Sequence, residues 1–278
     1  MISQTAATAG LLALSQSFAP LFADEKKRRF KIGACEWSLR KSDPSCMEIA
    51  KQIGIDGVLV DLGHVNSGMH LLKPDVQQAY LEAAKKNGVA VASLGMGEMN
   101  SVPLKNDPRA EEWLEKSVDV MTALNVPLVL VAAFGKGDLC GDKAGIDRTV
   151  ELLKKHALKA EKAGKIFGLE NYLSAKENLE ILDRVGSPAV QVYYDVGNST
   201  DKGYDIYKEI RMLKGRVCEF HAKDGKFMLG QGRVDFKKVR EAMDEINFSG
   251  WIQIEAAVPH DLVKDYTADA EFLRGIFS

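Results

Sequence analysis

The chain has 278 residues, of which 46% are hydrophobic, and this is enough for one large core or two small ones. The formal net charge is −2, so the sequence does not indicate the basic surface that a nucleic-acid partner usually requires. The four cysteines lie far apart without a C-x-x-C pair, which indicates neither a zinc finger nor a disulfide framework. A small-molecule partner is therefore expected.

Residues 1–28 differ in composition from the rest of the chain. The first 23 residues are apolar, small or uncharged, and the charged stretch DEKKRRF follows them. Ser, Gln and Pro interrupt this run too often for a stable membrane span. The pattern is typical of a truncated export signal, which predicts a periplasmic or exported protein; a frayed helix on a cytoplasmic protein is the alternative. Under both interpretations the fold is a single domain of residues 29–278.

From residue 30 onward one unit recurs, consisting of an apolar run, a polar loop, an amphipathic helical segment and then Gly or Asn. Most apolar runs are continuous rather than alternating, as expected for parallel strands that helices cover. Helices are expected between the strands; segment 43–54, for example, has Asp43 as its expected cap and Pro44 at the first helical position. Eight strands are predicted, at residues 30–37, 56–63, 89–97, 127–134, 165–172, 190–198, 216–224 and 251–258.

Eight strand–helix repeats over about 250 residues are the size and pattern of a (β/α)₈ TIM barrel, a fold of the α/β class. A doubly wound sheet is the competing architecture, and it usually carries a Gly-rich phosphate-binding turn after its first strand. Here the first strand ends in ACEWSLRK, which contains no such turn. The barrel is therefore the predicted fold.

Polar residues stand at the ends of the predicted strands, where the active sites of such barrels form. The last four strands end in GLE, YYD, EFH and QIE, which supply Glu170, Asp195, His221 and Glu255. Three converging carboxylates would be very costly to bury without a cation. Three oxygen ligands and one imidazole suit one divalent ion, with Mn²⁺ or Mg²⁺ favoured over Co²⁺ or Zn²⁺. Each residue alone is more typical of a structural role, but four on adjacent strands favour a metal.

Other strand-end residues are candidates for substrate contacts. Glu36 follows the first strand and His64 the second, and either could instead be a structural hydrogen bonder. Lys223 could polarise a carbonyl or meet an acidic group, and a solvated loop lysine is an equal alternative. The loops expected to matter most are residues 64–74 and 96–106.

Four further residues near the strand ends have weaker signals. Trp37, Tyr172 and Phe227 are candidates for the walls of a small-molecule site, although plain packing is more usual for aromatic residues at such positions. Asp224 is expected to orient His221 or its own loop rather than to touch substrate.

The chain from about residue 30 to its end resembles the xylose isomerase-like TIM barrel family, in the branch of the sugar phosphate isomerases and epimerases. The matching stretches, which are specific as a set, are GLEN at 168–171, YYDVGN at 193–198, EFHAKD at 219–224, LGQGRVDF at 229–236 and GWIQIEA at 250–256. The resemblance implies metal ligation by Glu170, Asp195, His221 and Glu255. It also implies that Glu170 and Glu255 are the catalytic acid/base pair.

The chemistry that the resemblance implies is isomerisation or epimerisation of a sugar or keto-sugar. A metal that chelates a carbonyl and its neighbouring hydroxyl acidifies the adjacent C–H. Glutamates on opposite sides of the substrate can remove a proton from one face and return one to the other, through a metal-bound enediolate. With a leaving group β to the carbonyl, the same site gives elimination. A metal-dependent lyase or dehydratase of a keto-glycoside or keto-inositol is therefore the main alternative.

Two positions depart from the pattern of the ketose 3-epimerases of this family. Those enzymes resemble D-x-x-H after the sixth strand, where this chain has Asn198, and they carry an arginine where this chain has Phe227. Both groups contact substrate hydroxyls in the family, so a free ketose is disfavoured as the substrate. Asn198 and Lys223 are the substrate-binding candidates of this region.

Two further functions are favoured less. An AP-endonuclease-like nuclease would need a three-zinc cluster built with many histidines, whereas this chain has five histidines and no basic excess. A non-catalytic sugar-binding barrel is opposed by the intact pair of glutamates. The sequence fixes neither the sugar, the stereocentre nor the native metal, and it leaves a homo-oligomer open.

Overall fold

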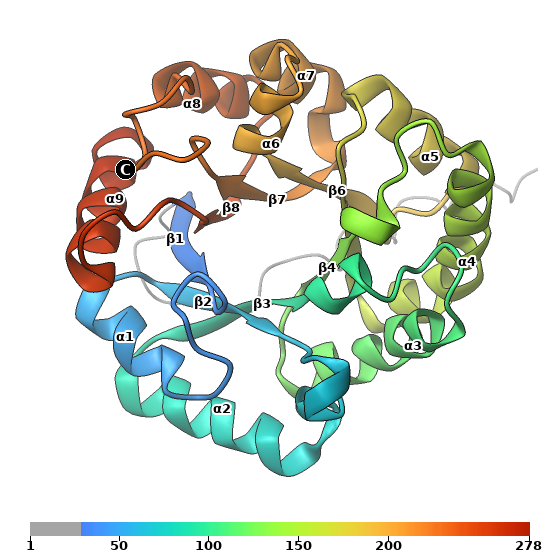
Figure 1. Cartoon of the computed structure of the whole chain (residues 1–278), viewed down its shortest axis with the longest axis horizontal. Coiled ribbons are helices and arrows are strands. Elements are labelled where there is room, and N and C mark those ends of the chain that lie inside the picture. Colours follow the sequence, from blue (N-terminus) through green and yellow to red (C-terminus); the bar gives the residue numbers. More distant parts are fainter. Residues whose placement is uncertain (1–28) are drawn as a thin grey trace, which may run out of the picture.

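The computed structural model describes residues 29–278, and the predicted export segment of residues 1–28 lies outside the described residues. Eight parallel strands close into a barrel in chain order, which confirms the predicted (β/α)₈ fold (Figure 1). The strands are β1 (Phe30–Cys35), β2 (Gly57–Asp61), β3 (Ala90–Met96), β4 (Leu128–Ala132), β5 (Ile166–Glu170), β6 (Val190–Asp195), β7 (Val217–Ala222) and β8 (Gly250–Ile254).

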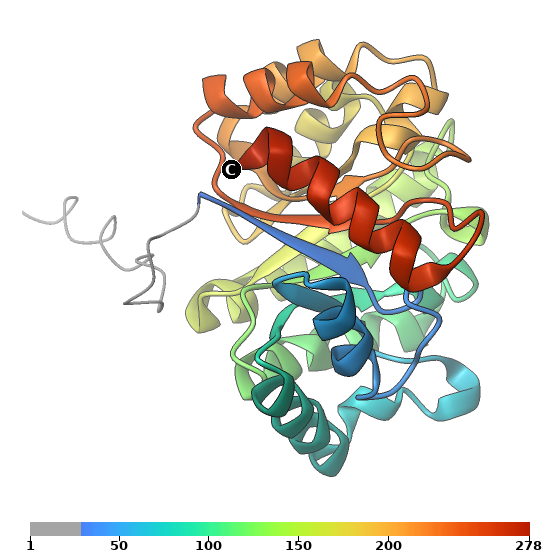
Figure 2. The ribbon, with the colours of Figure 1, turned by 90° about the vertical axis from the view of Figure 1, so that its left-hand side faces the viewer.

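Helices surround the strands as an outer ring (Figure 1). They are α1 (Cys46–Ile53), α2 (Pro74–Asn87), α3 (Pro108–Ala123), α4 (Lys143–Ala163), α5 (Ala175–Val185), α6 (Val196–Asp201), α7 (Ile206–Leu213), α8 (Phe236–Glu245) and α9 (Leu262–Phe277). The last helix, α9, packs beside α1 and β1, so the two ends of the described chain meet on one side of the barrel (Figure 2). No helix within residues 29–278 combines the length and apolar character that crossing a membrane requires.

Short polar signals set the ends of the helices. Ser174 and Glu177 form a reciprocal capping box at the start of α5, and Gly186, with φ of 72°, ends the helix. Helix α1 begins later than expected. Its first residue is Cys46, because Asp43 accepts a hydrogen bond from the Ser45 N–H within a preceding turn and does not cap the helix.

Side chains alternate along each strand between the helices and the barrel interior. Along β6, for example, Tyr194 packs in the outer core between strands and helices, whereas Tyr193 belongs to the small cluster inside the barrel. Asp195, two residues after Tyr193, therefore also points inward, at the end of the strand. The interior cluster consists of Cys35, Leu59, Leu128, Leu130, Ala132 and Tyr193.

Candidate metal centre

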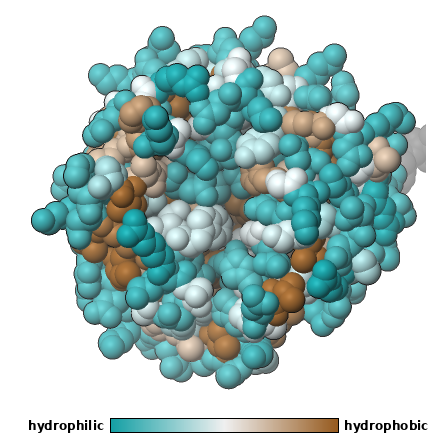
Figure 3. Space-filling view, viewed as in Figure 1, coloured by the Kyte–Doolittle hydropathy of each residue, from teal (hydrophilic) through white to brown (hydrophobic). Residues whose placement is uncertain are grey.

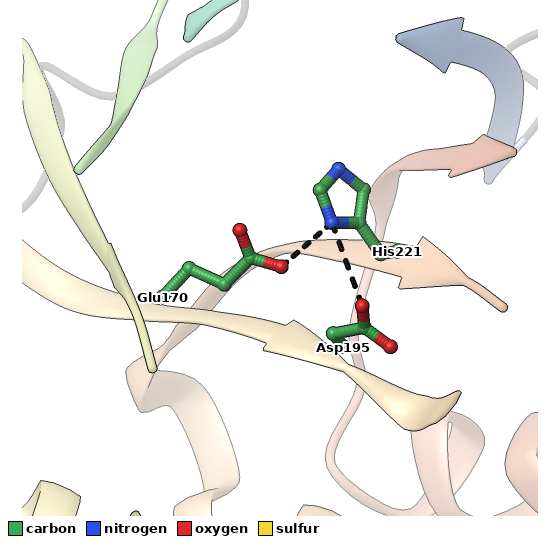
Figure 4. Close-up of side chains that lie close together, drawn as sticks. All are labelled: Glu170, Asp195 and His221. Atoms are coloured by element: carbon green, nitrogen blue, oxygen red, sulfur yellow. Dashed lines mark hydrogen bonds and ion pairs between the residues drawn. The ribbon is translucent and has the colours of Figure 1, made fainter. Parts of the chain in front are cut away.

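The ends of β5, β6 and β7 bring three predicted ligands together inside the barrel (Figure 4). One ligand atom each from Glu170, Asp195 and His221 lies within 4.8 Å of the others, and all three residues are buried. Nδ1 of His221 is 2.7 Å from Glu170 Oε1 and 3.9 Å from Asp195 Oδ2. Glu255, just beyond β8, places Oε2 3.9 Å from the same nitrogen. The three carboxylates thus surround one ring nitrogen of His221.

Asp195 shows whether these residues fit a cation. Its Oδ1 accepts hydrogen bonds from the backbone N–H groups of Gly197 and Asn198 at the start of α6. Its Oδ2 is buried and has no hydrogen-bond partner among residues 29–278. Burial raises the pKa of Asp195 to about 7, because the charged form is poorly solvated there. An unpartnered carboxylate oxygen that faces further carboxylates and an imidazole fits a divalent ion with oxygen and nitrogen ligands.

Glu255 accepts hydrogen bonds from two neighbouring side chains. Its Oε1 accepts a hydrogen bond of 2.8 Å from Trp37 Nε1, and its Oε2 lies 2.8 Å from Lys223 Nζ. Burial acts to raise the pKa of Glu255, but the charges of His221 and Lys223 outweigh burial and leave the pKa below its ordinary value. Glu255 is therefore the ionised, oriented carboxylate of the group.

Lys223 lies between two of the carboxylates. Its Nζ is 3.8 Å from Asp195 Oδ2 as well as 2.8 Å from Glu255 Oε2. Burial acts to lower the pKa of Lys223, but the two carboxylates outweigh it and raise the pKa, so the side chain stays an ammonium. Lys223 is thus paired with two buried carboxylates and is not a solvated loop lysine.

The second ring nitrogen of His221 faces away from the carboxylates. Nε2 lies 3.1 Å from Sγ of Cys35, which comes from the end of β1 on another part of the barrel wall. Burial raises the pKa of the Cys35 thiol to about 12, so its sulfur is an uncharged partner at neutral pH.

A cavity of about 400 Å³ opens over the cluster at the face where the strands end, which is hollowed near its centre (Figure 3). Trp37 lines one part of it, and Phe134 and Tyr172, with ring centroids 4.5 Å apart, line another. Phe227 is instead exposed and lines a separate hollow, so it does not wall this cavity. Among the predicted site residues, the cavity lining includes Glu36, His64, Glu170, Asn198, Lys223 and Glu255.

Glu36 and His64 both border the cavity but differ in how accessible their side chains are to solvent. The Glu36 carboxyl group is fully buried and accepts hydrogen bonds from the Asp61 N–H and the Tyr80 hydroxyl. Burial raises the pKa of Glu36 to about 7. His64 is exposed, and its Nδ1 lies 2.6 Å from Oε2 of Glu98. His64 is thus the more accessible of these two predicted substrate contacts.

Asp224 holds the loop that follows β7. Its carboxyl oxygens accept hydrogen bonds of 2.8–3.0 Å from the N–H groups of Gly230, Gly232 and Val234. Of the two roles expected for Asp224, the structure therefore supports the one within its own loop.

A buried polar layer below the ligands was missed by the sequence reasoning. Glu219 is fully buried, and its Oε1 accepts hydrogen bonds from Ser93 Oγ, Gln253 Nε2 and the Tyr193 hydroxyl. Its position two residues before His221 is the signal that could have found it, because strand alternation points both side chains inward.

Comparisons with known proteins agree with this fold. The sequence model of the xylose isomerase-like TIM barrel family matches residues 47–276. The 2-epi-5-epi-valiolone 7-phosphate 2-epimerase of Actinoplanes sp. is 26% identical over 197 residues, which are 70% of this chain and 73% of that protein. The putative L-ribulose-5-phosphate 3-epimerase SgbU of Escherichia coli is 23% identical over 256 residues, which are 82% of this chain and 89% of that protein.

Solved structures show the same architecture. The D-psicose 3-epimerase from Clostridium cellulolyticum H10, solved with D-tagatose, has a TM-score of 0.76 at 19% identity and covers 89% of this chain and 99% of its own. The 3-keto-D-glucoside 4-epimerase YcjR from E. coli has a TM-score of 0.75 at 15% identity and covers 88% of this chain and 99% of its own. Since the family's sequence model spans most of the described barrel, the chain belongs to the xylose isomerase-like TIM barrel family.

Proposed function

We propose that the protein is a divalent-metal-dependent epimerase or isomerase of a sugar or keto-sugar. The observation that carries the proposal is the convergence of Glu170, Asp195 and Glu255 on Nδ1 of His221 below an open cavity. The relatives and structural neighbours named above are all called epimerases, which supports the reaction class.

In this proposal, Glu170, Asp195, His221 and Glu255 hold one divalent ion, with Mn²⁺ or Mg²⁺ favoured and Co²⁺ or Zn²⁺ as alternatives. Such an ion supplies Lewis acidity to a carbonyl oxygen and its neighbouring hydroxyl. This acidifies the C–H of the hydroxyl-bearing carbon next to the carbonyl.

Glu255 and Glu170 are the proposed acid/base pair. Glu255 is ionised, the form that can accept a proton, and the Trp37 hydrogen bond holds its other oxygen. Glu170, from β5, is suited to exchange a proton at the other face of the substrate. Removal of a proton beside the carbonyl gives an enediolate, whose developing negative charge the ammonium of Lys223 can stabilise.

The remaining lining groups are proposed to bind the substrate. Trp37 and the Phe134–Tyr172 pair offer flat apolar faces, which suit the C–H faces of a sugar. His64 and Asn198 are proposed to hydrogen-bond substrate hydroxyls. Glu36 borders the cavity as well and remains a proposed contact, although Asp61 and Tyr80 already bond its carboxyl group.

A lyase or dehydratase of a keto-glycoside or keto-inositol is the second candidate. The observation that favours it is the ammonium of Lys223 2.8 Å from Glu255, because a fixed positive charge beside the base can stabilise the negative charge on a departing oxygen. Both candidates share the first proton abstraction.

Elemental mass spectrometry of protein purified without a histidine tag, compared with His221→Ala, tests the metal. Near-stoichiometric Mn, Mg, Co or Zn in the wild type and its loss in the variant are expected. Incubation with ketoses, ketose phosphates and keto-glycosides in D₂O then tests the reaction. Deuterated epimers would support an epimerase and unsaturated products a lyase. A metal-loaded protein that exchanges no proton in any of these substrates would contradict both candidates.

A further inference from the structure

We infer that Cys35 is a positioning residue that fixes which nitrogen of His221 is presented to the metal. The inference rests on the proposed function for the presence of an ion, but it does not depend on the substrate. Its basis is the 3.1 Å contact between Cys35 Sγ and His221 Nε2, which joins β1 to β7 inside the barrel. Both side chains are essentially inaccessible to solvent.

An imidazole that binds a metal ion must be neutral, with one nitrogen that donates a hydrogen bond and one that accepts. In His221, Nδ1 faces the carboxylates of Glu170, Asp195 and Glu255. Cys35 supplies the only hydrogen-bond contact of Nε2 among residues 29–278. If Nε2–H donates to the sulfur of Cys35, the lone pair of Nδ1 is directed at the carboxylates, where the ion would lie.

Packing alone does not determine which nitrogen of His221 faces the carboxylates. The ring of Tyr193 lies 4.5 Å from the His221 ring, and Trp37 meets it edge-on at 6.3 Å, measured between centroids. These contacts restrict the plane of the imidazole. They discriminate weakly between the ring and its flipped form, in which each nitrogen exchanges place with a carbon. A polar contact at Nε2 does discriminate, because the flipped ring would present a carbon to the sulfur.

The choice of a thiol has a chemical consequence. Histidines that bind metals usually donate their second N–H to a carboxylate, a carbonyl or water, which fixes the tautomer and raises the basicity of the ligand nitrogen. A thiol sulfur is a weaker acceptor. Cys35 therefore orients the ring of His221 without adding a fourth negative charge to a site that already holds three carboxylates.

Three variants test the inference. Cys35→Ala removes the acceptor, Cys35→Ser keeps one, and Cys218→Ala is a matched control because Cys218 is another strand thiol whose sulfur contacts the carbonyl of Val192. The affinity for Mn²⁺ would be measured by titration calorimetry. Cys35→Ala is expected to weaken it about 10–100-fold, the usual effect of losing such a partner. Cys35→Ser is expected to recover most of the affinity, and Cys218→Ala to leave it unchanged.

A spectroscopic readout needs no variant. Nitrogen-15 NMR of the Mg²⁺-loaded wild type is expected to show the proton of His221 on Nε2, and circular dichroism would verify the fold of each variant. A proton on Nδ1, or wild-type Mn²⁺ affinity in folded Cys35→Ala, would overturn the inference and leave the proposed function intact. A wild-type protein that binds neither Mn²⁺ nor Mg²⁺ would overturn both.

Discussion

Asp195 and Glu219 are buried carboxyl groups on neighbouring strands of the barrel interior, and each has one oxygen without a hydrogen-bond partner in the described chain. Burial raises the pKa of both. Their neighbours differ. The hydrogen-bond donors to Glu219 are the uncharged side chains of Ser93, Tyr193 and Gln253, so one proton makes that layer neutral.

Asp195 faces a different environment, because Glu170 and Glu255 lie beside it and share the same histidine nitrogen. The ammonium of Lys223 offsets only one of the three carboxylate charges, so this layer needs further positive charge, such as a proton on His221 or a bound metal ion. The comparison teaches that burial does not by itself identify a functional acid. The number of acids that converge, and the charge of their hydrogen-bond donors, separates the two layers.

The largest expected effect is a difference in turnover between variants of the proposed ligands and a variant of Glu219. Glu170→Gln and Glu255→Gln are each expected to lower turnover by roughly 10²–10⁴-fold, because the amide cannot transfer the proton. Glu219→Gln is expected to keep turnover within severalfold, since it removes a charge from a layer that needs none. Steady-state assays on the substrate found by deuterium exchange would measure this. Equal losses in all three variants would break the distinction between the layers.

Lys223→Met tests the role of the ammonium group that lies beside Asp195 and Glu255. Turnover is expected to fall roughly 100-fold, because a charge that stabilises the deprotonated substrate is lost. Affinity for Mn²⁺ is expected to be unchanged or higher, since the ammonium no longer competes for Asp195 and Glu255. Parallel kinetic assays and metal titrations would show whether turnover falls while Mn²⁺ affinity is kept. Weaker metal binding would assign Lys223 a structural role instead.

Asp195→Asn tests how much the buried charge of Asp195 destabilises the metal-free protein. The pKa of Asp195 in the folded, metal-free protein is about 7, above its ordinary value of 3.8, so the folded state binds this proton more tightly than the unfolded state. Stability of the metal-free protein should therefore fall as pH rises from about 4 to about 7. Asp195→Asn should remove this part of the fall and stabilise the metal-free protein at pH 8 by on the order of 1–3 kcal/mol.

Urea unfolding at several pH values would measure these stabilities. Added Mn²⁺ should stabilise the wild type at pH 8 but not Asp195→Asn, because only the wild type keeps the complete ligand set. A variant less stable than the wild type at pH 8 would show that the acidic layer is not strained in the metal-free protein.

The smallest effect is expected at Trp37. Trp37→Phe keeps an aromatic ring in the cavity wall but removes the hydrogen bond to Glu255. Losing a hydrogen bond to a charged group is worth about 1.5 kcal/mol, so turnover should fall roughly 10-fold with little change in metal content. An unchanged rate would show that Lys223 alone orients Glu255.

Much of the barrel could be predicted because its signals are local. Most strands are largely apolar runs, and in the second half of the chain the end of such a run marks a residue that points into the mouth, as for GLE at Glu170 and EFH at His221. Helix α6 was missed because VGN continues the β-like pattern of β6, whereas Asp195 caps a helix there.

Contacts across the barrel could not be predicted from local signals. Cys35 meets His221 only because the strands curve round until β1 and β7 face the same interior, and a lone cysteine in an apolar run is typical of ordinary packing. Phe227 was misplaced for a related reason. The loop that Asp224 holds sets its direction, and such a loop is fixed by backbone hydrogen bonds that side-chain patterns do not reveal.

The pairing of β1 with β8 has a consequence for the stage of folding at which the proposed metal site is completed. All four proposed ligands come from the second half of the chain, but Trp37 and Cys35, which contact Glu255 and His221, come from its first strand. Pairing of Phe30 with Gly250 joins segments that are far apart in the chain, so the first emerges from the ribosome long before the second. Tight metal capture should therefore appear only after the ring has closed, and time-resolved Mn²⁺ uptake during refolding would report that final event.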